Sequence, residues 1–298
     1  MPSLQTDLLF NTRCRLGEGP LWHPTEQRLY WVDIENNNLF YSNAELTDYT
    51  KVDFPTPIGA FGFVKNGGLV LATGEGFAAW DGTTEILEAI WNPFSDHPHL
   101  RGKTGRFVPA GRFWSGTLDP AGSQAALSRL DPDGSRHTML RGIGISNGLG
   151  WSPDCKTMYS TDSLRYTIYA FDYDLATGQI RNQRPFIQLP KDGRGIVPDG
   201  LCVDAEGCVW SAQWNGWQVV RYSPAGEVLQ IVALPTQLVT SCCFGGSNLD
   251  QLFITTAWTD LSPAEREAQP HAGGVFILKT NTQGQPAIFF SSPEPKGV

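Results

Sequence analysis

A repeated pattern of short β-strands constrains the fold of this chain more than any other feature. Residues 18–22, 147–151 and 199–203 (EGPLW, NGLGW and DGLCV) share one order: a polar residue, a glycine and a short apolar stretch. A turn and a second strand-like segment follow each copy, as in HPTEQ before RLYWVDI. Weaker copies begin near residues 58, 104 and 240, so that six units recur at intervals of 40 to 52 residues. This spacing is typical of a four-stranded propeller blade.

Six such units predict an all-β fold, a six-bladed β-propeller with four-stranded blades around a central channel. Radial repetition of this kind protects the strand edges once the ring closes. We expect residues 1–298 to form this one domain. The 32 glycines and 21 prolines are spread along the chain, as many turns require, and helical periodicity is confined to SPAEREAQ at 262–269. A chance succession of β-meanders is the alternative.

Composition and charge exclude several classes of function. Hydrophobic residues make up 41% of the chain and charged residues 17%, which favours a large core. The formal charge of −8 argues against nucleic-acid and anionic-membrane partners, and no apolar stretch is long enough for a membrane span or a signal peptide. The six cysteines form neither a Cys-x-x-Cys pair nor a Cys/His cluster. They indicate thiols packed in the core of a cytoplasmic protein.

The phase of the repeat brings three polar residues into correspondence. Glu18, Asn147 and Asp199 occupy the same position in blades one, four and five, just before the strand nearest the axis. Each alone is explained by a turn, since Asn-Gly and Asp-Gly are favoured turn pairs. Together they place two carboxylates and an amide oxygen at one mouth of the channel, where the carboxylates repel unless a cation lies between them. Oxygen donors favour Ca²⁺, Mg²⁺ or Mn²⁺, and open positions favour a catalytic metal.

Several longer motifs resemble a known family. LGEGPLWHPTEQRLYWVDI, PAGRFWSGTLD, ISNGLGWSPDCKTMYSTDS and VPDGLCVDAEGCVWSAQWNG resemble the regucalcin/gluconolactonase family, also called senescence marker protein or sugar lactonase, whose members are six-bladed propellers. The resemblance implies hydrolysis of sugar lactones with one divalent metal, and Glu18, Asn147 and Asp199 as its ligands. It also implies that Asp199 steers or deprotonates the attacking water. Whether the metal is Ca, Mg, Mn, Zn or Fe stays open.

One segment departs from that family. Before PAGRFW these proteins usually carry Arg-x-Asn-Asp-Gly, which holds the substrate, whereas this chain reads Arg101-Gly102-Lys103-Thr104-Gly105. The resemblance implies a substrate-binding role for Arg101. Lys103 is either a solvated loop residue or an ammonium group that faces the substrate. His97 and His99, just upstream, lie on a polar loop that is either plain surface or part of the entrance.

These observations predict a metal-dependent carboxylic-ester hydrolase that opens aldonolactones to the corresponding acids. Its partner is a small sugar lactone, and the protein is a monomer or a small homo-oligomer. No Gly-x-Ser-x-Gly nucleophile elbow is present. One alternative is a non-catalytic, regucalcin-like protein that binds a divalent metal or a metabolite. Another is a scaffold for protein partners, which leaves the three phased ligands unexplained.

Four further residues receive structural interpretations. Asp33, Asp162 and Asp172 recur at the ends of second or third strands, which indicates turn formation. His23 follows the first inner strand and is interpreted as a packed or capping residue.

Overall fold

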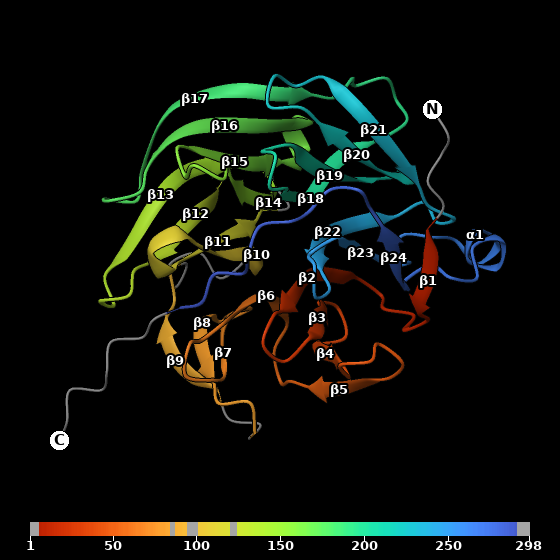
Figure 1. The fold of residues 1–298 in the computed structure, drawn as a ribbon, viewed down its shortest axis with the longest axis horizontal. Helices are drawn as coiled ribbons and strands as arrows, with labels where there is room; N and C mark the ends of the chain where they lie inside the picture. Colours follow the sequence, from red (N-terminus) through yellow and green to blue (C-terminus); the bar gives the residue numbers. More distant parts are fainter. Residues whose placement is uncertain (1–5, 84–86, 94–100, 120–123, 291–298) are drawn as a thin grey trace.

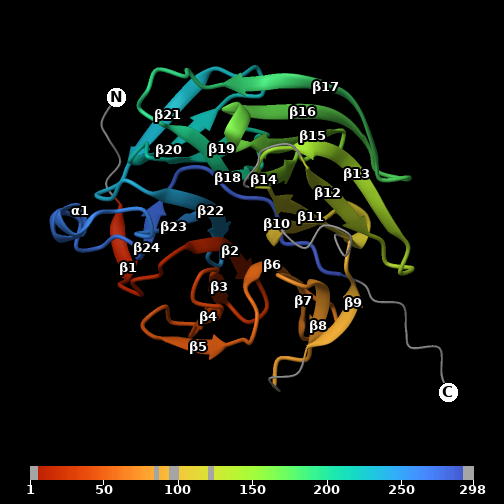
Figure 2. The ribbon, with the colours of Figure 1, turned by 180° about the vertical axis from the view of Figure 1, so that it is seen from behind.

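The blades form a closed ring around a central axis. The computed structural model describes residues 6–83, 87–93, 101–119 and 124–290, and at positions 101, 103, 104, 107 and 109 it describes the backbone without the side chain. Six four-stranded antiparallel sheets follow one another around the ring (Figures 1 and 2). The predicted six-bladed β-propeller is therefore confirmed, and each predicted inner strand is the first strand of a blade.

Blades one to three each consist of four consecutive strands. Blade one contains β2 (Gly17–His23), β3 (Arg28–Asp33), β4 (Asn38–Ser42) and β5 (Tyr49–Asp53). Blade two contains β6 (Ile58–Phe63), β7 (Leu69–Thr73), β8 (Gly76–Trp80) and β9 (Glu88–Trp91). Blade three contains β10 (Arg101–Val108), β11 (Arg112–Leu118), β12 (Ala125–Leu130) and β13 (Arg136–Ile143), with the 3₁₀ turn η1 (Pro109–Gly111) between its first two strands.

Blades four and five repeat this order. Blade four contains β14 (Ser146–Trp151), β15 (Thr157–Asp162), β16 (Thr167–Asp174) and β17 (Gln179–Gln188), with the 3₁₀ turn η2 (Ser163–Arg165) after β15. Blade five contains β18 (Val197–Val203), β19 (Val209–Trp214), β20 (Gln218–Tyr222) and β21 (Val228–Ala233).

Blade six joins the two ends of the repeat. It contains β22 (Val239–Gly245), β23 (Gln251–Thr256) and β24 (Val275–Lys279), and its outer strand is β1 (Asp7–Phe10) from the start of the chain. The pairing aligns Asp7 with Ile277 and Leu8 with Phe276. Because the outermost strand of this blade comes from the other end of the repeat, the ring is closed by ladder hydrogen bonds as well as by packing.

The core fills the spaces between neighbouring blades. Second strands are covered on both faces, so they read as nearly continuous apolar runs, and every residue of β7 is buried. Three tryptophans in second strands, Trp31, Trp114 and Trp210, are completely buried. Trp31 stacks between Phe10 of β1 and Phe40, at centroid distances of 5.6 and 5.3 Å. Aromatic packing thus also ties the closing strand to blade one.

The predicted helical segment is confirmed. Residues 263–268 form the short helix α1 (Pro263–Ala268), whose capping box pairs Ser262 with Glu265. In the described part of the chain, no helix combines the length and apolar character that crossing a membrane requires. All six cysteines are free thiols; five are buried and Cys155 is half-buried, in agreement with a packing role.

The segment after β24 crosses one end of the central channel (Figure 1). Isolated bridges join Gly284 to Asp204 in blade five and Phe290 to Val64 in blade two. Between them, the Gln285 side-chain amide donates to the carbonyl oxygens of Trp151 at 2.9 Å and Val203 at 3.2 Å. The segment 284–290, called the tail below, therefore closes the channel at the end opposite the strand starts.

Candidate metal centre

Glu18, Asn147 and Asp199 lie on three of the inner strands that surround the axis of the ring. They lie near the starts of β2, β14 and β18, and all three are buried, with 6%, 3% and 3% of their surface exposed. The glycine that follows each of them lines the same small cavity, of about 20 Å³. The shared sequence phase thus corresponds to a shared place in the channel.

Each of these three inner strands loses register with its neighbour at the candidate ligand. The skips fall between Glu18 and Leu21, between Ser146 and Leu149, and between Pro198 and Leu201. A β-bulge leaves residues outside the ladder and re-aims their side chains. The three polar residues therefore lie within strands rather than just before them, and the turn interpretation of Asn147-Gly148 and Asp199-Gly200 is wrong.

The glycines at 148 and 200 allow the inner strands to approach one another closely. A Cβ on Gly148 would lie 2.5 Å from the Leu201 nitrogen and 2.8 Å from the Asp199 carbonyl oxygen. A Cβ on Gly200 would lie 2.2 Å from Ser241 Oγ in the next blade. Strand packing around the axis thus explains the glycines at 148 and 200, whereas Gly19 has a left-handed backbone with φ of 56°, which favours glycine.

A buried hydrogen-bond chain fixes the Asn147 amide. Its Nδ2 donates to Ser163 Oγ at 2.8 Å, and the Ser163 hydroxyl donates to the Pro198 carbonyl oxygen at 2.7 Å. Because the oxygen and the nitrogen of an amide diverge from its carbon within one plane, Oδ1 points away from Ser163 when Nδ2 donates to it. The chain also connects Asn147 to the residue before Asp199. Ser163 was not among the sequence-predicted residues.

Asp33 and Asp162 accept hydrogen bonds from the backbone just before two of the candidate ligands. Asp33 accepts from the backbone N–H groups of the residues three and two before Glu18, at 2.8 and 3.0 Å. Asp162 accepts from the corresponding groups before Asn147, at 3.1 and 3.3 Å. Both carboxylates are buried and both support the site, so their interpretation as turn-forming residues is wrong. Asp172 lies within β16, where it is exposed and pairs with Arg184 of β17, so its interpretation as a turn-forming residue is also wrong.

The donor set suits a hard divalent cation. Glu18 and Asp199 offer carboxylate oxygens and Asn147 offers an amide oxygen, with no nitrogen or sulfur donor among them. Burying two carboxylates at one place is unfavourable unless charge of the opposite sign compensates them. Within the described ranges, no group of three or more His, Cys, Asp and Glu residues could hold a metal. The candidate site has only two carboxylates, those of Glu18 and Asp199, so it needs the amide oxygen of Asn147 as its third protein ligand.

For the substrate-binding candidates Arg101 and Lys103, the structure describes only the position of the backbone. Lys103 lies in β10 at the register skip between Gly102 and Thr104, in the same phase as the candidate ligands of the other blades. Arg101 begins the same strand. The side chains of Arg101 and Lys103, and all of His97 and His99, lie outside the described residues. His23 is packed as predicted, since its ring contacts Phe63 at a centroid distance of 4.6 Å and its Nδ1 accepts from the Glu26 N–H.

The fold and the arrangement at its axis define a class of protein, the six-bladed propellers that present oxygen donors at the mouth of the channel. The profile of the SMP-30/gluconolactonase/LRE-like family matches residues 16–258, and the chain belongs to this family. Human regucalcin is 36% identical over 286 residues, which cover 93% of this chain and 95% of regucalcin.

Two solved structures extend the comparison. A luciferin-regenerating enzyme superimposes with a TM-score of 0.89 at 27% identity, covering 97% of this chain and 100% of the enzyme. A regucalcin from Agrobacterium tumefaciens, described as a calcium-binding protein, superimposes with a TM-score of 0.91 at 25% identity, covering 97% and 98% of the two chains.

Proposed function

We propose that this protein is a metal-dependent lactonase that opens sugar lactones, of the aldonolactone type, to their acids. The observation that carries the proposal is that three buried oxygen-donor residues on inner strands are each followed by a glycine that lines one small cavity. Membership of a family named after gluconolactonase supports this reaction class. A small polar substrate also suits a site at a channel mouth.

Glu18, Asn147 and Asp199 would hold the cation in this proposal. When bound, a divalent cation supplies Lewis-acid polarisation of the lactone carbonyl. The described calcium binding of the Agrobacterium relative supports calcium as the first metal to test. Mg, Mn, Zn and Fe are the other candidates.

Asp199 has a second role in the proposal. Its carboxylate orients a water molecule and accepts a proton from it while the water oxygen attacks the carbonyl carbon. The ring C–O bond then breaks, and the proton passes to the departing alkoxide oxygen, which leaves a hydroxy acid. Arg101 and Lys103 would donate hydrogen bonds to ring hydroxyls or to the developing negative charge.

A second candidate function is divalent-metal binding without catalysis. It is favoured by the calcium-binding description of the Agrobacterium relative and by Lys103, which stands where the lactonase pattern has an asparagine. In that case the same three residues bind the cation, and no lactone turnover accompanies the binding.

A pH-indicator assay with a panel of aldonolactones tests the proposal. Protein treated with a chelator should be inactive and should regain activity with one or more of the five metals. Asp199→Asn should lower turnover by about 10²–10⁴-fold, the usual worth of a positioned base. Asp172→Asn, at an exposed ion pair, is the matched control and should retain full activity. Equal turnover with and without metal would contradict the proposal, whereas tight metal binding without turnover would support the second candidate.

A further inference from the structure

A second cavity lies on the axis near the tail, deeper in the channel than the candidate metal centre. It has a volume of about 120 Å³. The inner strand of every blade contributes to its lining. One residue from each of these strands, taken together as the inner ring below, gives Leu21, Gly62, Arg106, Gly150, Cys202 and Cys243. In blades one, four and five these residues come three positions after the candidate ligands. The cavity therefore lies on the same axis as the candidate metal centre but at a different level, farther along the inner strands.

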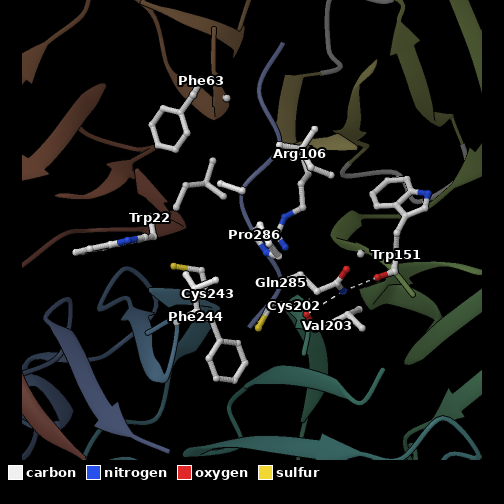
Figure 3. Close-up of a pocket in the computed structure, with 16 residues that line it drawn as sticks. Trp22, Phe63, Arg106, Trp151, Cys202, Val203, Cys243, Phe244, Gln285 and Pro286 are labelled. Carbon is white, nitrogen blue, oxygen red and sulfur yellow. Dashed lines mark hydrogen bonds between the residues drawn. The ribbon is translucent and has the colours of Figure 1, made fainter. Parts of the chain in front are cut away.

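Arg106 is the one charged side chain among the described residues that line this cavity. It extends from β10 to the middle of the cavity and ends beside Pro286 of the tail (Figure 3). Its guanidinium makes no hydrogen bond or ion pair with any residue in the described ranges. A half-buried guanidinium normally has such partners, because removing its charge from water is unfavourable.

The neighbouring polar groups do not neutralise Arg106. Burial raises the pKa of the Cys202 thiol well above its usual value, and burial likewise raises that of Cys243, so both remain uncharged at neutral pH. The Gln285 amide nitrogen is already bound to the Trp151 and Val203 carbonyl oxygens. The positive charge of Arg106 is thus left for a ligand.

Apart from Arg106 and the Gln285 amide, most side chains that line the cavity are apolar. Beyond the inner ring the cavity is lined by aromatic and aliphatic side chains such as Trp22, Phe63 and Ile288. A ligand rich in hydroxyl groups, such as an aldonic acid, would find few hydrogen-bond partners there. A cavity of about 150 Å³ accommodates benzene, so this one has room for a somewhat smaller organic group. Pro286 lines the cavity and is exposed, which places the entrance beside the tail.

We propose that this cavity binds a short aliphatic monocarboxylate, with its carboxylate on Arg106 and its hydrocarbon chain against the apolar wall. The planar guanidinium matches a carboxylate in bidentate geometry. The available volume limits the whole acid to about four carbons, because its carbons and two carboxylate oxygens then equal benzene in number of heavy atoms. This site needs neither the metal nor lactone turnover, so it is independent of the proposed function.

Isothermal titration of the full chain, freed of metal by a chelator, tests the proposal with butyrate as the probe. Butyrate should bind more tightly than chloride and more tightly than butyramide, its neutral analogue. Arg106→Met should weaken butyrate binding by at least about tenfold, as the loss of charge-assisted hydrogen bonds implies. Arg184→Met removes the same charge from the exposed pair with Asp172 and should leave binding unchanged.

A second variant separates charge from space. Ala287 lines the cavity from the tail, so Ala287→Leu should fill part of it and weaken butyrate binding with Arg106 intact. Circular dichroism and thermal melting establish that each variant is folded. The proposal is overturned if wild type does not bind butyrate, if chloride or butyramide binds equally well, or if folded Arg106→Met binds butyrate like wild type.

Discussion

Replacing Ser163 by alanine removes one hydroxyl that makes two buried hydrogen bonds. It accepts from Asn147 Nδ2 at 2.8 Å and donates to the Pro198 carbonyl oxygen at 2.7 Å. Each of the two partners left without a hydrogen bond costs about 1–3 kcal/mol, so the free energy of unfolding should fall by about 2–6 kcal/mol. The Asn147 amide is then free to rotate. Loss of such an outer-sphere contact typically weakens metal affinity by about 10–100-fold, and we expect the same here.

Calorimetric titration with Ca²⁺ and with Mn²⁺ measures the affinity, and urea denaturation measures the stability. Ser146→Ala is the matched control, because Ser146 precedes Asn147 and its buried hydroxyl has no hydrogen-bond partner among the described residues. That variant should bind metal like wild type and lose little stability. Equal metal affinity in the two serine variants would refute the role assigned to the Asn147–Ser163 contact.

Three other perturbations test separate parts of the account. Lys103→Asn should barely change metal affinity while KM or kcat worsens, because we expect the ammonium to face the substrate; a variant unchanged in calorimetry and kinetics would make Lys103 a surface residue. Burial lowers the pKa of His23, so the unfolded chain takes up the proton first. Stability should therefore fall as the pH drops below about 6.5, and His23→Gln should flatten that slope in denaturation curves at pH 5 to 8. Arg106→Met should tighten divalent-metal binding about fourfold at low salt. Arg106 follows the phase of the candidate ligands by three residues, or about 10 Å of strand, and at that distance its repulsion of a divalent ion costs about 0.8 kcal/mol in water. An unchanged Kd would contradict this coupling.

The number and order of the blades follow from sequence because each blade repeats a local pattern. The polar-residue–glycine pair marks the start of an inner strand, and the hairpins that follow it use short turns. Ring closure by β1 has no such signal. Its four residues, Asp7–Phe10, pair with a strand near the other end of the repeat, and only the three-dimensional arrangement makes that edge available.

The candidate ligands could be identified by phase, but the residues that support them could not. Asp33 and Asp162 accept hydrogen bonds from residues 17 and 18 positions earlier in the chain, so in sequence they look like ordinary strand-end aspartates. Ser163 contacts Pro198, 35 positions away, for the same reason. The bulges at the candidate ligands depend on register between strands, which periodicity alone does not reveal.

Anomalous diffraction from crystals of the protein soaked with Mn²⁺ shows whether a metal ion binds to Glu18, Asn147 and Asp199. We expect one strong peak on the propeller axis, with oxygen atoms of Glu18, Asn147 and Asp199 each within about 2.6 Å of it, and no such peak in Asp199→Asn crystals. A peak bound elsewhere, or no axial peak in wild-type crystals at saturating metal, would contradict this expectation.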